Sequence, residues 1–286
     1  MTTILITGSK GQLGNEMQQA AVRFPAFNYI YTDVAELDIC DKSALDAFVK
    51  ANNVNVIVNC AAYTAVDKAE DDVELCYKIN RDAVRNIAEV ANDNKVKVVH
   101  VSTDYVFDGT NYLPYTEDMP VCPATVYGKS KLEGEQALLE NCKESVILRT
   151  AWLYSSFGNN FVKTMMKLGT ERDSLGVIFD QVGTPTYAAD LADAILQLLR
   201  NETFVPGIYH FSDEGVCSWY DFTKTIHRMA NITCDVKPIE TKDYPARTPR
   251  PHFSVLNKGK IKSTYGISIP HWEVSLEKCI QLLQNS

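Results

Sequence analysis

Short apolar runs alternate with longer amphipathic stretches along the first half of the chain. The runs have the length of buried strands, and they cover residues 3–7, 28–32, 54–60, 96–102 and 145–150. The stretches between them have the spacing of helices with one apolar face, and they cover about 13–23, 42–52, 71–93 and 127–141. Strands that alternate with helices in this way pair in parallel through right-handed crossovers. We therefore predict an α/β fold with a Rossmann-type, doubly wound parallel sheet.

The alternation loosens after Arg149. A predicted helix at about 160–172 is followed by an apolar run at 177–179, a break at 183–185 and a second predicted helix at about 188–200. Most of the prolines lie beyond that helix, which indicates a loop-rich segment.

These patterns predict two parts. We expect a dinucleotide-binding domain at 1–150, joined by a return segment at about 176–205. We expect a smaller, loop-rich C-terminal lobe at about 151–175 and 206–286, and the family resemblance described below implies that this lobe binds the substrate.

The first predicted strand leads directly into a glycine-rich loop. Gly8 permits a tight turn, Gly11 a close backbone approach, and Gly14 close packing of the following helix. Such a loop points backbone N–H groups and the positive end of the helix dipole at a pyrophosphate. The spacing is GxxGxxG rather than GxGxxG, so a simple turn is the alternative, but the strand before it and the helix after it favour a nucleotide site. The predicted cofactor contacts here are Gly8, Lys10, Gly11, Gln12, Leu13 and Gly14.

An acidic residue, Asp33, ends the second predicted strand. A carboxylate at this place accepts the adenosine ribose hydroxyls and repels a 2′-phosphate, so the sequence favours NADH over NADPH. If Asp33 is an ordinary turn residue, Asp38 and Ile39 would flank the adenine instead, and either cofactor would serve. Asp38 is alternatively a helix cap for the segment that begins near Asp41.

The third and fourth predicted strands end in small or hydroxyl-bearing residues. The third runs into Ala61, Ala62 and Tyr63, where small side chains let a dinucleotide lie across the sheet edge, and we predict cofactor contacts from all three. The fourth ends at Thr103 and Asp104. Ligands of such sheets bind at the carboxyl ends of the strands, so Thr103 is predicted at the same edge.

Tyr127 and Lys131 are four residues apart in the fourth predicted helix, and therefore lie on one face of it. A nearby cation favours the phenolate and lowers the pKa of a tyrosine from its usual ~10. A proton donor to a carbonyl near neutral pH needs that adjustment. This spacing is common by chance, so alone it is weak evidence for a catalytic pair. The nucleotide-binding loop and Thr103 support the prediction. We predict that Thr103, Tyr127 and Lys131 are catalytic, and that Tyr127 and Lys131 also contact the cofactor.

Composition narrows the choice of function classes. A hydrophobic content of 45% in 286 residues is ordinary for a globular protein, and a net charge of −8 without a basic run argues against a nucleic-acid partner. The eight cysteines include no CxxC pair and the five histidines have no ligand spacing, so we expect reduced thiols and no metal site. We find neither a signal peptide nor an apolar run of membrane length, and expect a cytoplasmic protein without a membrane partner.

Several sequence blocks together resemble the extended short-chain dehydrogenase/reductases. These blocks are ITGSKGQLG (6–14), NCAAYTAVDKAE (59–70), VSTDYVFDG (101–109), VYGKSKLEGE (126–135) and RTAWLY (149–154). Within that group they are most similar to the dTDP-4-dehydrorhamnose reductase family. The similarity continues through GNNFVKTM (158–165), DQVGTPT (180–186), GIYHFS (207–212) and RPHFSVLN (250–257), and so spans essentially the whole chain.

The resemblance implies NAD(P)H-dependent reduction of the C4 ketone of dTDP-4-dehydro-6-deoxy-L-mannose to dTDP-L-rhamnose. Tyr127 would protonate the developing alkoxide, and Lys131 would hold the nicotinamide ribose and depress the pKa of Tyr127. The implied substrate-binding residues are Thr103, Asp104, Trp152, Asn159, Asn160, Arg247 and Arg250. From the residues alone, Trp152 could equally be a core aromatic and the arginines solvated surface groups, although a guanidinium suits a diphosphate.

Some members of this family bind a divalent cation at a subunit interface through acidic residues. Glu16 matches one such position, whereas the other region here contains Asp190, which is shorter than glutamate. We expect exposed carboxylates at both positions and no metal. A homodimer is an assembly compatible with the resemblance.

Two alternative functions share the same fold. A sugar-nucleotide epimerase or dehydratase would hold NAD tightly, and Asp104 beside Thr103 is the kind of acidic residue that dehydratases add. A regulatory subunit resembling the β subunit of methionine adenosyltransferase would not turn over a substrate. The retention of Thr103, Tyr127 and Lys131 together argues against a purely regulatory role.

Overall fold

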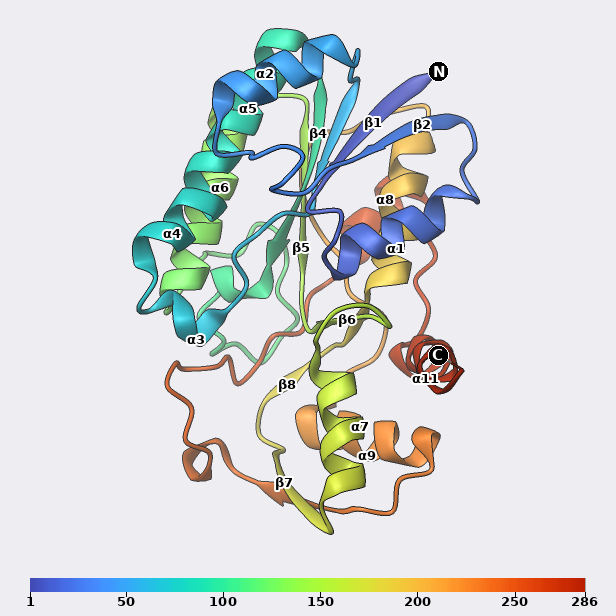
Figure 1. The fold of residues 1–286 in the computed structure, drawn as a ribbon. Helices are drawn as coiled ribbons and strands as arrows, with labels where there is room; N and C mark the ends of the chain where they lie inside the picture. The colour runs from blue at the N-terminus through green and yellow to red at the C-terminus, as the bar shows by residue number, and fades with distance from the viewer. Residues whose placement is uncertain (286) are drawn as a thin grey trace.

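The central sheet has the predicted Rossmann-type architecture (Figure 1). In the computed structural model, which describes residues 1–285, six parallel strands pair in the order β10-β5-β4-β3-β1-β2. The strands are β1 (Thr2–Thr7), β2 (Phe27–Tyr31), β3 (Val56–Asn59), β4 (Lys97–Thr103), β5 (Ser145–Thr150) and β10 (Gly207–His210). The α/β class and the first five predicted strands are confirmed, with small shifts at the strand ends.

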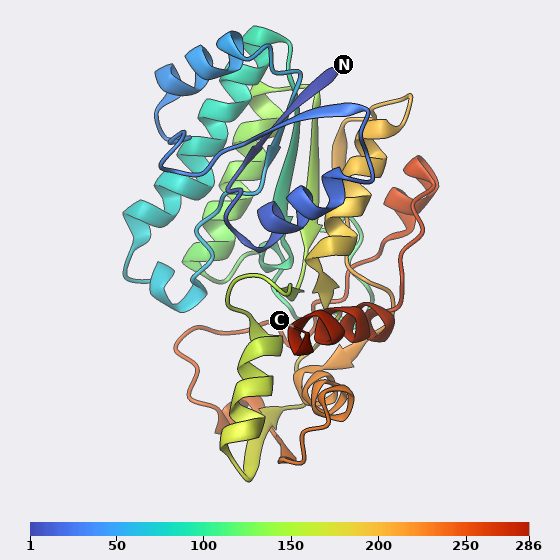
Figure 2. The ribbon, with the colours of Figure 1, turned by 45° about the vertical axis from the view of Figure 1, so that its right-hand side comes forward.

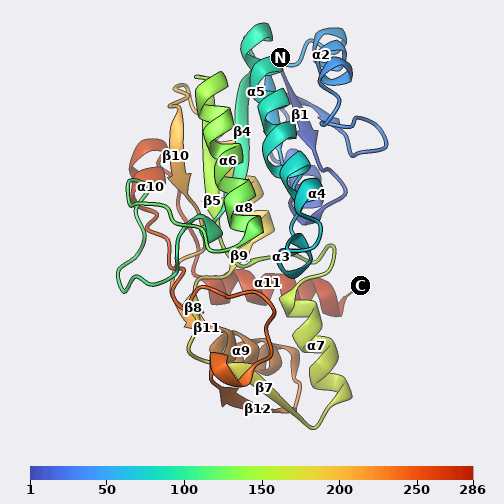
Figure 3. The ribbon, with the colours of Figure 1, turned by 90° about the vertical axis from the view of Figure 1, so that its left-hand side faces the viewer.

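Helices cover both faces of this sheet (Figures 1 and 3). One face carries α2 (Lys42–Ala51), α5 (Ala83–Asn94) and α6 (Val126–Asn141). The other face carries α1 (Gln12–Ala21) and α8 (Ala188–Arg200), while α10 (Gly259–Tyr265) packs at the edge strand β10. The inner strands β1, β3, β4 and β5 are mostly buried because helices cover both of their faces, which explains their continuous apolar runs.

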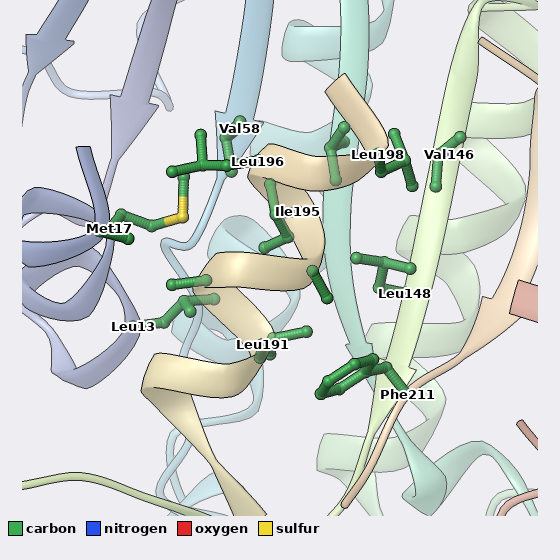
Figure 4. Packing of buried hydrophobic residues seen from close by; sticks show 14 of the residues in the cluster. Leu13, Met17, Val58, Val146, Leu148, Leu191, Ile195, Leu196, Leu198 and Phe211 are labelled. Carbon is green, nitrogen blue, oxygen red and sulfur yellow. The ribbon is translucent and has the colours of Figure 1, made fainter. Parts of the chain in front are cut away.

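The core on one face is built around α8 (Figure 4). Its apolar side places Leu191, Ile195 and Leu198 against the strands, and Leu13 and Met17 of α1 pack beside it. Each fully buried aliphatic side chain of this kind contributes about 1.5–3 kcal/mol relative to an exposed one. The residues of α1 and α8 thereby fix the helix that follows the glycine loop against the sheet.

A π-helical turn interrupts the long helix predicted at 71–93. The chain runs through α4 (Val73–Tyr77), the π-helical segment η1 (Lys78–Asp82) and then α5. Asn80 of η1 is buried, exchanges hydrogen bonds with the backbone of Tyr63, and donates to Ser130 Oγ on α6 at 3.1 Å. Its carbonyl lies so close to α6 that a Cβ at Gly134 would approach it to 2.0 Å. This turn therefore presses the α4–α5 segment against α6.

The C-terminal lobe has its own apolar core (Figures 1 and 2). Residues of α7 (Phe161–Glu171), β7 (Ser174–Ile178), α9 (Trp219–Ala230), β12 (Asp235–Ile239) and α11 (Trp272–Gln284) meet there. Three two-stranded pairs complete the lobe and its junction with the sheet: β7 with β12, β8 (Val182–Gly183) with β11 (Cys217–Ser218), and β6 (Leu153–Tyr154) with β9 (Thr186–Tyr187). The remaining short elements are α3 (Val66–Ala69), η2 (Asp104–Val106) and η3 (Thr241–Asp243).

The chain returns to the sheet through one helix and one strand. The expected return segment, 176–205, contains β8 and most of β7, which pair within the lobe, and then α8, which does cover the sheet. The strand that rejoins the sheet is β10, beyond residue 205, which pairs in parallel with β5. Its four residues are too few for a periodicity signal. Within residues 1–285, no helix combines the length and the apolar character needed to cross a membrane.

A buried ion pair attaches α6 to the sheet. Arg149 of β5 and Glu135 of α6 are joined by N–O distances of 2.7 to 3.2 Å, and their side chains are 3% and 1% exposed. Removing one partner of such a pair leaves an uncompensated buried charge, which is strongly destabilising.

We therefore expect Glu135→Gln to lower the free energy of unfolding by about 3 kcal/mol, measured by denaturant titration. The matched control is Glu171→Gln, which removes an exposed partner of Lys167 and is expected to cost less than about 0.5 kcal/mol. Equal effects of the two substitutions would contradict the role given to the buried pair.

Candidate active site

The glycine loop lies at the carboxyl end of β1, where the chain order in the sheet reverses between β1 and β3. Gly8 has a left-handed backbone (φ +64°), and a Cβ there would approach Ala61 Cα to 2.7 Å. A Cβ at Gly14 would approach Gly8 O to 2.4 Å. Gly11 is the N-cap of α1 and offers no side-chain cap, so the N–H groups of the first turn are available to a ligand. These features fit the pyrophosphate of a dinucleotide.

A cavity of about 530 Å³ extends from this loop over the ends of β2 and β3. Its lining includes the predicted cofactor residues Gly8, Lys10, Gly11, Asp33, Asp38, Ile39, Ala61 and Ala62. Gln12 and Leu13 line the second cavity described below, and Gly14 packs under the loop.

The Asp33 carboxylate is held by the backbone around it. Oδ2 accepts from Lys10 N at 3.0 Å and Oδ1 from Val34 N at 2.9 Å. The Lys10 ammonium pairs with Glu36 at 2.7 Å. Asp33 is thus a turn residue whose carboxylate also lines the cavity. The interpretation as a turn residue and the interpretation as a cofactor contact are therefore compatible.

The alternative that Asp38 caps a helix is wrong. Asp41 is the N-cap of α2 and accepts from Ala44 N at 2.9 Å, whereas Asp38 accepts from Cys40 N within the preceding turn. The cap falls on Asp41 because α2 begins at Lys42. Asp38 and the buried Ile39 instead line the first cavity.

Tyr63, another predicted cofactor residue, is engaged elsewhere. Its backbone pairs with Asn80 and its hydroxyl donates to Asp72 at 2.8 Å. It is absent from the described lining of both cavities. Asn80 of η1 fixes the backbone of Tyr63, and the Asp72 carboxylate holds its hydroxyl.

A second cavity of about 580 Å³ adjoins the first and shares Gly11, Cys60 and Ala62 with it. Thr103, Tyr127 and Lys131 all line it, together with Asp104 and Trp152. The cavity with the predicted cofactor residues is therefore continuous with the cavity that holds the predicted catalytic group.

Local structure explains why Tyr127 meets Thr103. Thr125 caps α6 by accepting from Gly128 N at 3.0 Å, and a Cβ at Gly128 would approach Tyr105 O to 2.3 Å. The first turn of α6 is therefore pressed against η2, which begins directly after Thr103. The Tyr105 and Tyr127 rings pack edge to face at 5.4 Å.

The predicted reduction of the Tyr127 pKa by Lys131 is not found. Burial raises the pKa of Tyr127 above its ordinary value, and the hydroxyl of Thr103 acts in the opposite direction. The phenol is therefore protonated at neutral pH, as a proton donor must be. Lys131 is not among the groups that shift this pKa, and its Nζ donates to the backbone of β4 instead.

Lys131 is 2% exposed, and its Nζ donates to Val101 O at 2.7 Å. The same nitrogen lies 3.4 Å from Nε2 of the buried His100. Burial lowers the pKa of Lys131 to about 8, against the opposing influence of Glu135 and Cys76. The lysine thus stands near the border between its charged and neutral forms at physiological pH.

Asp104, beside Thr103, is also buried. Its Oδ1 accepts from Thr103 Oγ1 at 3.0 Å, and its Oδ2 has no hydrogen-bond partner among the described residues. Burial raises the pKa of this carboxyl to about 7, and the bond from Thr103 opposes the increase.

Trp152 has a left-handed backbone (φ 50°), which is a strained conformation for a bulky residue and often marks a functional site. Its ring stacks on Trp219 with centroids 3.4 Å apart, and a Cβ at Gly183 would approach it to 2.7 Å. Trp152 lines the second cavity, so it is both packed and accessible to a ligand.

Asn159 and Asn160 line the same cavity. The amide of Asn160 is already used: Oδ1 caps α7 by accepting from Lys163 N, and Nδ2 donates to Gln12 Oε1 at 3.0 Å. Asn160 therefore ties the lobe to the glycine loop, while Asn159 is exposed toward the cavity.

Arg247 and Arg250 lie on the loop after η3 and outside the described lining of the cavity. Arg250 pairs with Asp67 of α3 at 2.6 Å, and both terminal guanidinium nitrogens of Arg247 pair with the Asp71 carboxylate. Val66, which precedes Asp67 in α3, lines the cavity, so the Arg250–Asp67 pair lies at the margin of the cavity.

The prediction of exposed carboxylates at Glu16 and Asp190 is wrong for both residues. Glu16 is 4% exposed and accepts from Ser155 Oγ at 2.6 Å, while Asp190 is partly buried and accepts from Ser275. Glu16 is covered beside Ser155, and Asp190 beside Ser275 of α11. Within residues 1–285, no group of three or more His, Cys, Asp and Glu side chains has the geometry of a metal site.

Sequence reasoning missed several residues that contact the predicted site residues: Asn59, His100, Trp219, Asp67 and Asp71. Asn59 and His100 did leave a signal, because each is a polar residue within an apolar run. The others depend on long-range packing and gave none.

The Rossmann-type sheet, the glycine loop and the buried Tyr127–Lys131 pair define an oxidoreductase of the short-chain dehydrogenase/reductase type. The chain belongs to the RmlD substrate-binding domain family, whose model matches residues 1–285.

Individual relatives are similar to this chain over almost their whole lengths. A dTDP-4-dehydrorhamnose reductase of Aggregatibacter actinomycetemcomitans is 42% identical, covering 97% of this chain and 98% of the relative. The crystal structure of a dTDP-4-dehydrorhamnose reductase from Clostridium acetobutylicum is 43% identical with a TM-score of 0.95, covering 99% of this chain and 100% of that one. A Bacillus anthracis structure of the same activity, in complex with NADP, is 38% identical with a TM-score of 0.94 and the same coverage.

The raised pKa of Asp104 makes stability depend on pH. The folded protein binds this proton more tightly than an unfolded chain with the ordinary pKa of 3.8, so its stabilising effect is lost as pH rises from about 4 through 7. The free energy of unfolding of the wild-type protein should therefore decrease between pH 5 and pH 8. In Asp104→Asn this decrease should be smaller than in the wild-type protein by about 2 kcal/mol. Denaturant titrations at the two pH values measure this, with the exposed Asp93→Asn as control. An unchanged pH dependence would contradict the assignment.

Proposed function

We propose that this chain reduces the C4 ketone of dTDP-4-dehydro-6-deoxy-L-mannose to dTDP-L-rhamnose with NADPH or NADH. The observation that carries the proposal is the convergence of Thr103, Tyr127 and Lys131 on a cavity continuous with the glycine-loop cavity. The relatives that share the whole chain carry the same activity in their names.

The reduced nicotinamide supplies the hydride, and the chain orients the ketone and provides the proton. Tyr127 keeps its proton at neutral pH because it is buried, and it releases that proton only to an oxygen that gains negative charge. Thr103 places a second hydroxyl beside the same oxygen. Both residues are nearly inaccessible to water, which strengthens their interactions with a developing charge.

The arginines at the cavity margin suit the diphosphate of the substrate. In this structure the two arginines bind carboxylates in the way that they would bind a phosphate. Arg247 donates to both oxygens of Asp71, and Arg250 donates to one oxygen of Asp67. We assign the diphosphate to Arg247 and Arg250, with Trp152 and Asn159 next to the sugar. The loop at 243–252 would then exchange carboxylate partners for the substrate.

Tyr127→Phe tests the proton donor. Removing one hydroxyl from a positioned acid should lower kcat by about 10²–10⁴ while binding of NAD(P)H is retained, because the ring and its packing remain. The assay follows NAD(P)H absorbance after addition of the dTDP-4-keto sugar. Tyr112→Phe, at an exposed tyrosine, is the control. Full activity of Tyr127→Phe would remove Tyr127 from the mechanism.

The charges near the adenosine end favour NADH. Asp33 presents a carboxylate on the cavity wall, and the Lys10 ammonium, which could attract a 2′-phosphate, is neutralised by Glu36. The NADP complex of the B. anthracis relative supports use of the phosphorylated cofactor in this family, so we propose a preference rather than an exclusion.

Glu36→Gln should release Lys10 and raise the ratio of kcat/KM for NADPH to that for NADH by about fivefold at low salt. Parallel assays with the two cofactors measure the ratio. Glu89→Gln removes a comparable surface partner, from Lys42, away from the cavity and is the matched control. A wild-type preference for NADPH, or no change in the Glu36 variant, would contradict this account.

A further inference from the structure

A row of buried polar side chains crosses the sheet beneath the catalytic group. Parallel pairing sets Thr7 of β1 opposite Asn59 of β3, and Asn59 opposite His100 of β4. Thr7 Oγ1 donates to Asn59 Oδ1 at 2.7 Å, and Asn59 Nδ2 lies 3.0 Å from His100 Nδ1. His100 Nε2 then faces Lys131 Nζ. All four side chains are at most 2% exposed.

The orientation of the Asn59 amide is determined by a backbone donor. Ala61 N donates to Asn59 Oδ1 at 3.2 Å, and a backbone N–H can only donate. The oxygen must therefore face Ala61 and Thr7, which turns the NH₂ group toward His100.

This orientation selects one tautomer of His100. Since Asn59 Nδ2 donates, His100 Nδ1 must be the acceptor and carry no proton. Burial and the neighbouring Lys131 lower the pKa of His100 well below its ordinary value, so the ring is neutral and its single proton sits on Nε2.

The tautomer of His100 determines which hydrogen bonds Lys131 can form. His100 presents an N–H rather than a lone pair to the ammonium, so it cannot accept one of the three lysine protons. Val101 O is the hydrogen-bond acceptor that the structure gives Nζ within residues 1–285. Two donors of the ammonium therefore stay free for ligands in the cavity, and a neutral amine would accept from His100 without any rearrangement.

We propose that His100, held in its Nε2–H tautomer by Asn59, is a positioning residue that keeps the donors of Lys131 free for the cofactor and the catalytic tyrosine. This proposal deepens the reductase function, and its kinetic consequences rest on that function. The tautomer itself does not.

The first test reads the tautomer directly. Two-dimensional ¹H–¹⁵N spectra of the imidazole rings distinguish a protonated from an unprotonated nitrogen, and His100 is assigned by its absence from the His100→Phe spectrum. We expect a bare Nδ1 and a protonated Nε2 in the wild-type protein. A proton on Nδ1, or a charged ring at neutral pH, would overturn the proposal whether or not the protein is a reductase.

The second test reverses the tautomer. In Asn59→Asp the carboxylate can only accept hydrogen bonds, so it favours the tautomer of His100 with its proton on Nδ1. Nε2 then carries a lone pair, which accepts a hydrogen bond from the Lys131 ammonium. We expect the ¹⁵N pattern to invert, the Kd for NAD(P)H to rise, and kcat to fall about tenfold, a coupling within the range of contacting residues.

A double-mutant cycle separates this effect from the added charge. In the His100→Phe background, Asn59→Asp should change kcat and the Kd for NAD(P)H by less than about twofold, because the relay from residue 59 to Lys131 is missing. Equal losses in both backgrounds would show a general electrostatic or structural effect and contradict the positioning role. If Asn59→Asp does not fold, as judged by thermal unfolding, the wild-type spectrum still decides the tautomer. If the tautomer is as expected but no variant or wild-type protein turns over the keto sugar, the proposed function fails and the tautomer assignment stands.

Discussion

The burial of the Lys131 ammonium is the constraint on which the site depends. A charged amine inside a protein is expensive unless it is compensated, and one backbone carbonyl of β4 compensates it here. That contact requires α6 to lie very close to the sheet. The buried Glu135–Arg149 pair holds the helix against β5. Gly128 and Gly134 let η2 and η1 pack closely against the same helix, since a Cβ at either glycine would collide with the backbone oxygen of Tyr105 or Asn80. The position of Tyr127 follows, because it lies one turn earlier on the same helix.

Two cavities adjoin at the carboxyl edge of the sheet. The glycine loop and the ends of β2 and β3 form one cavity, while the ends of β4 and β5, with the start of the lobe, form the other. The lobe is linked to the nucleotide domain by polar contacts, such as Asn160 with Gln12 and Arg250 with Asp67. The substrate region therefore borders on both parts, as expected for a reaction between two bound molecules.

Local patterns predicted most of the fold. The five buried strands and the helices between them follow from apolar periodicity, and the placement of Thr103 near Tyr127 follows from the rule that carboxyl ends of parallel strands share one edge. The π-helical turn at Asn80 and the four-residue strand β10 escaped prediction because their signals lie in packing against distant elements. The orientation of the Asn59 amide likewise depends on the register of three strands, and the pKa of Tyr127 depends on burial rather than on sequence distance to Lys131.

The most direct measurement of the central claim is the fate of the transferred hydride. The protein would be incubated with dTDP-4-dehydro-6-deoxy-L-mannose and NADH or NADPH deuterated at the transferable C4 position, and the sugar product examined by NMR. The account predicts one deuterium at C4 of a dTDP-6-deoxy sugar and one oxidised cofactor for each product molecule. A product without deuterium, or turnover without net oxidation of the cofactor, would contradict the account and indicate an enzyme that recycles its nicotinamide.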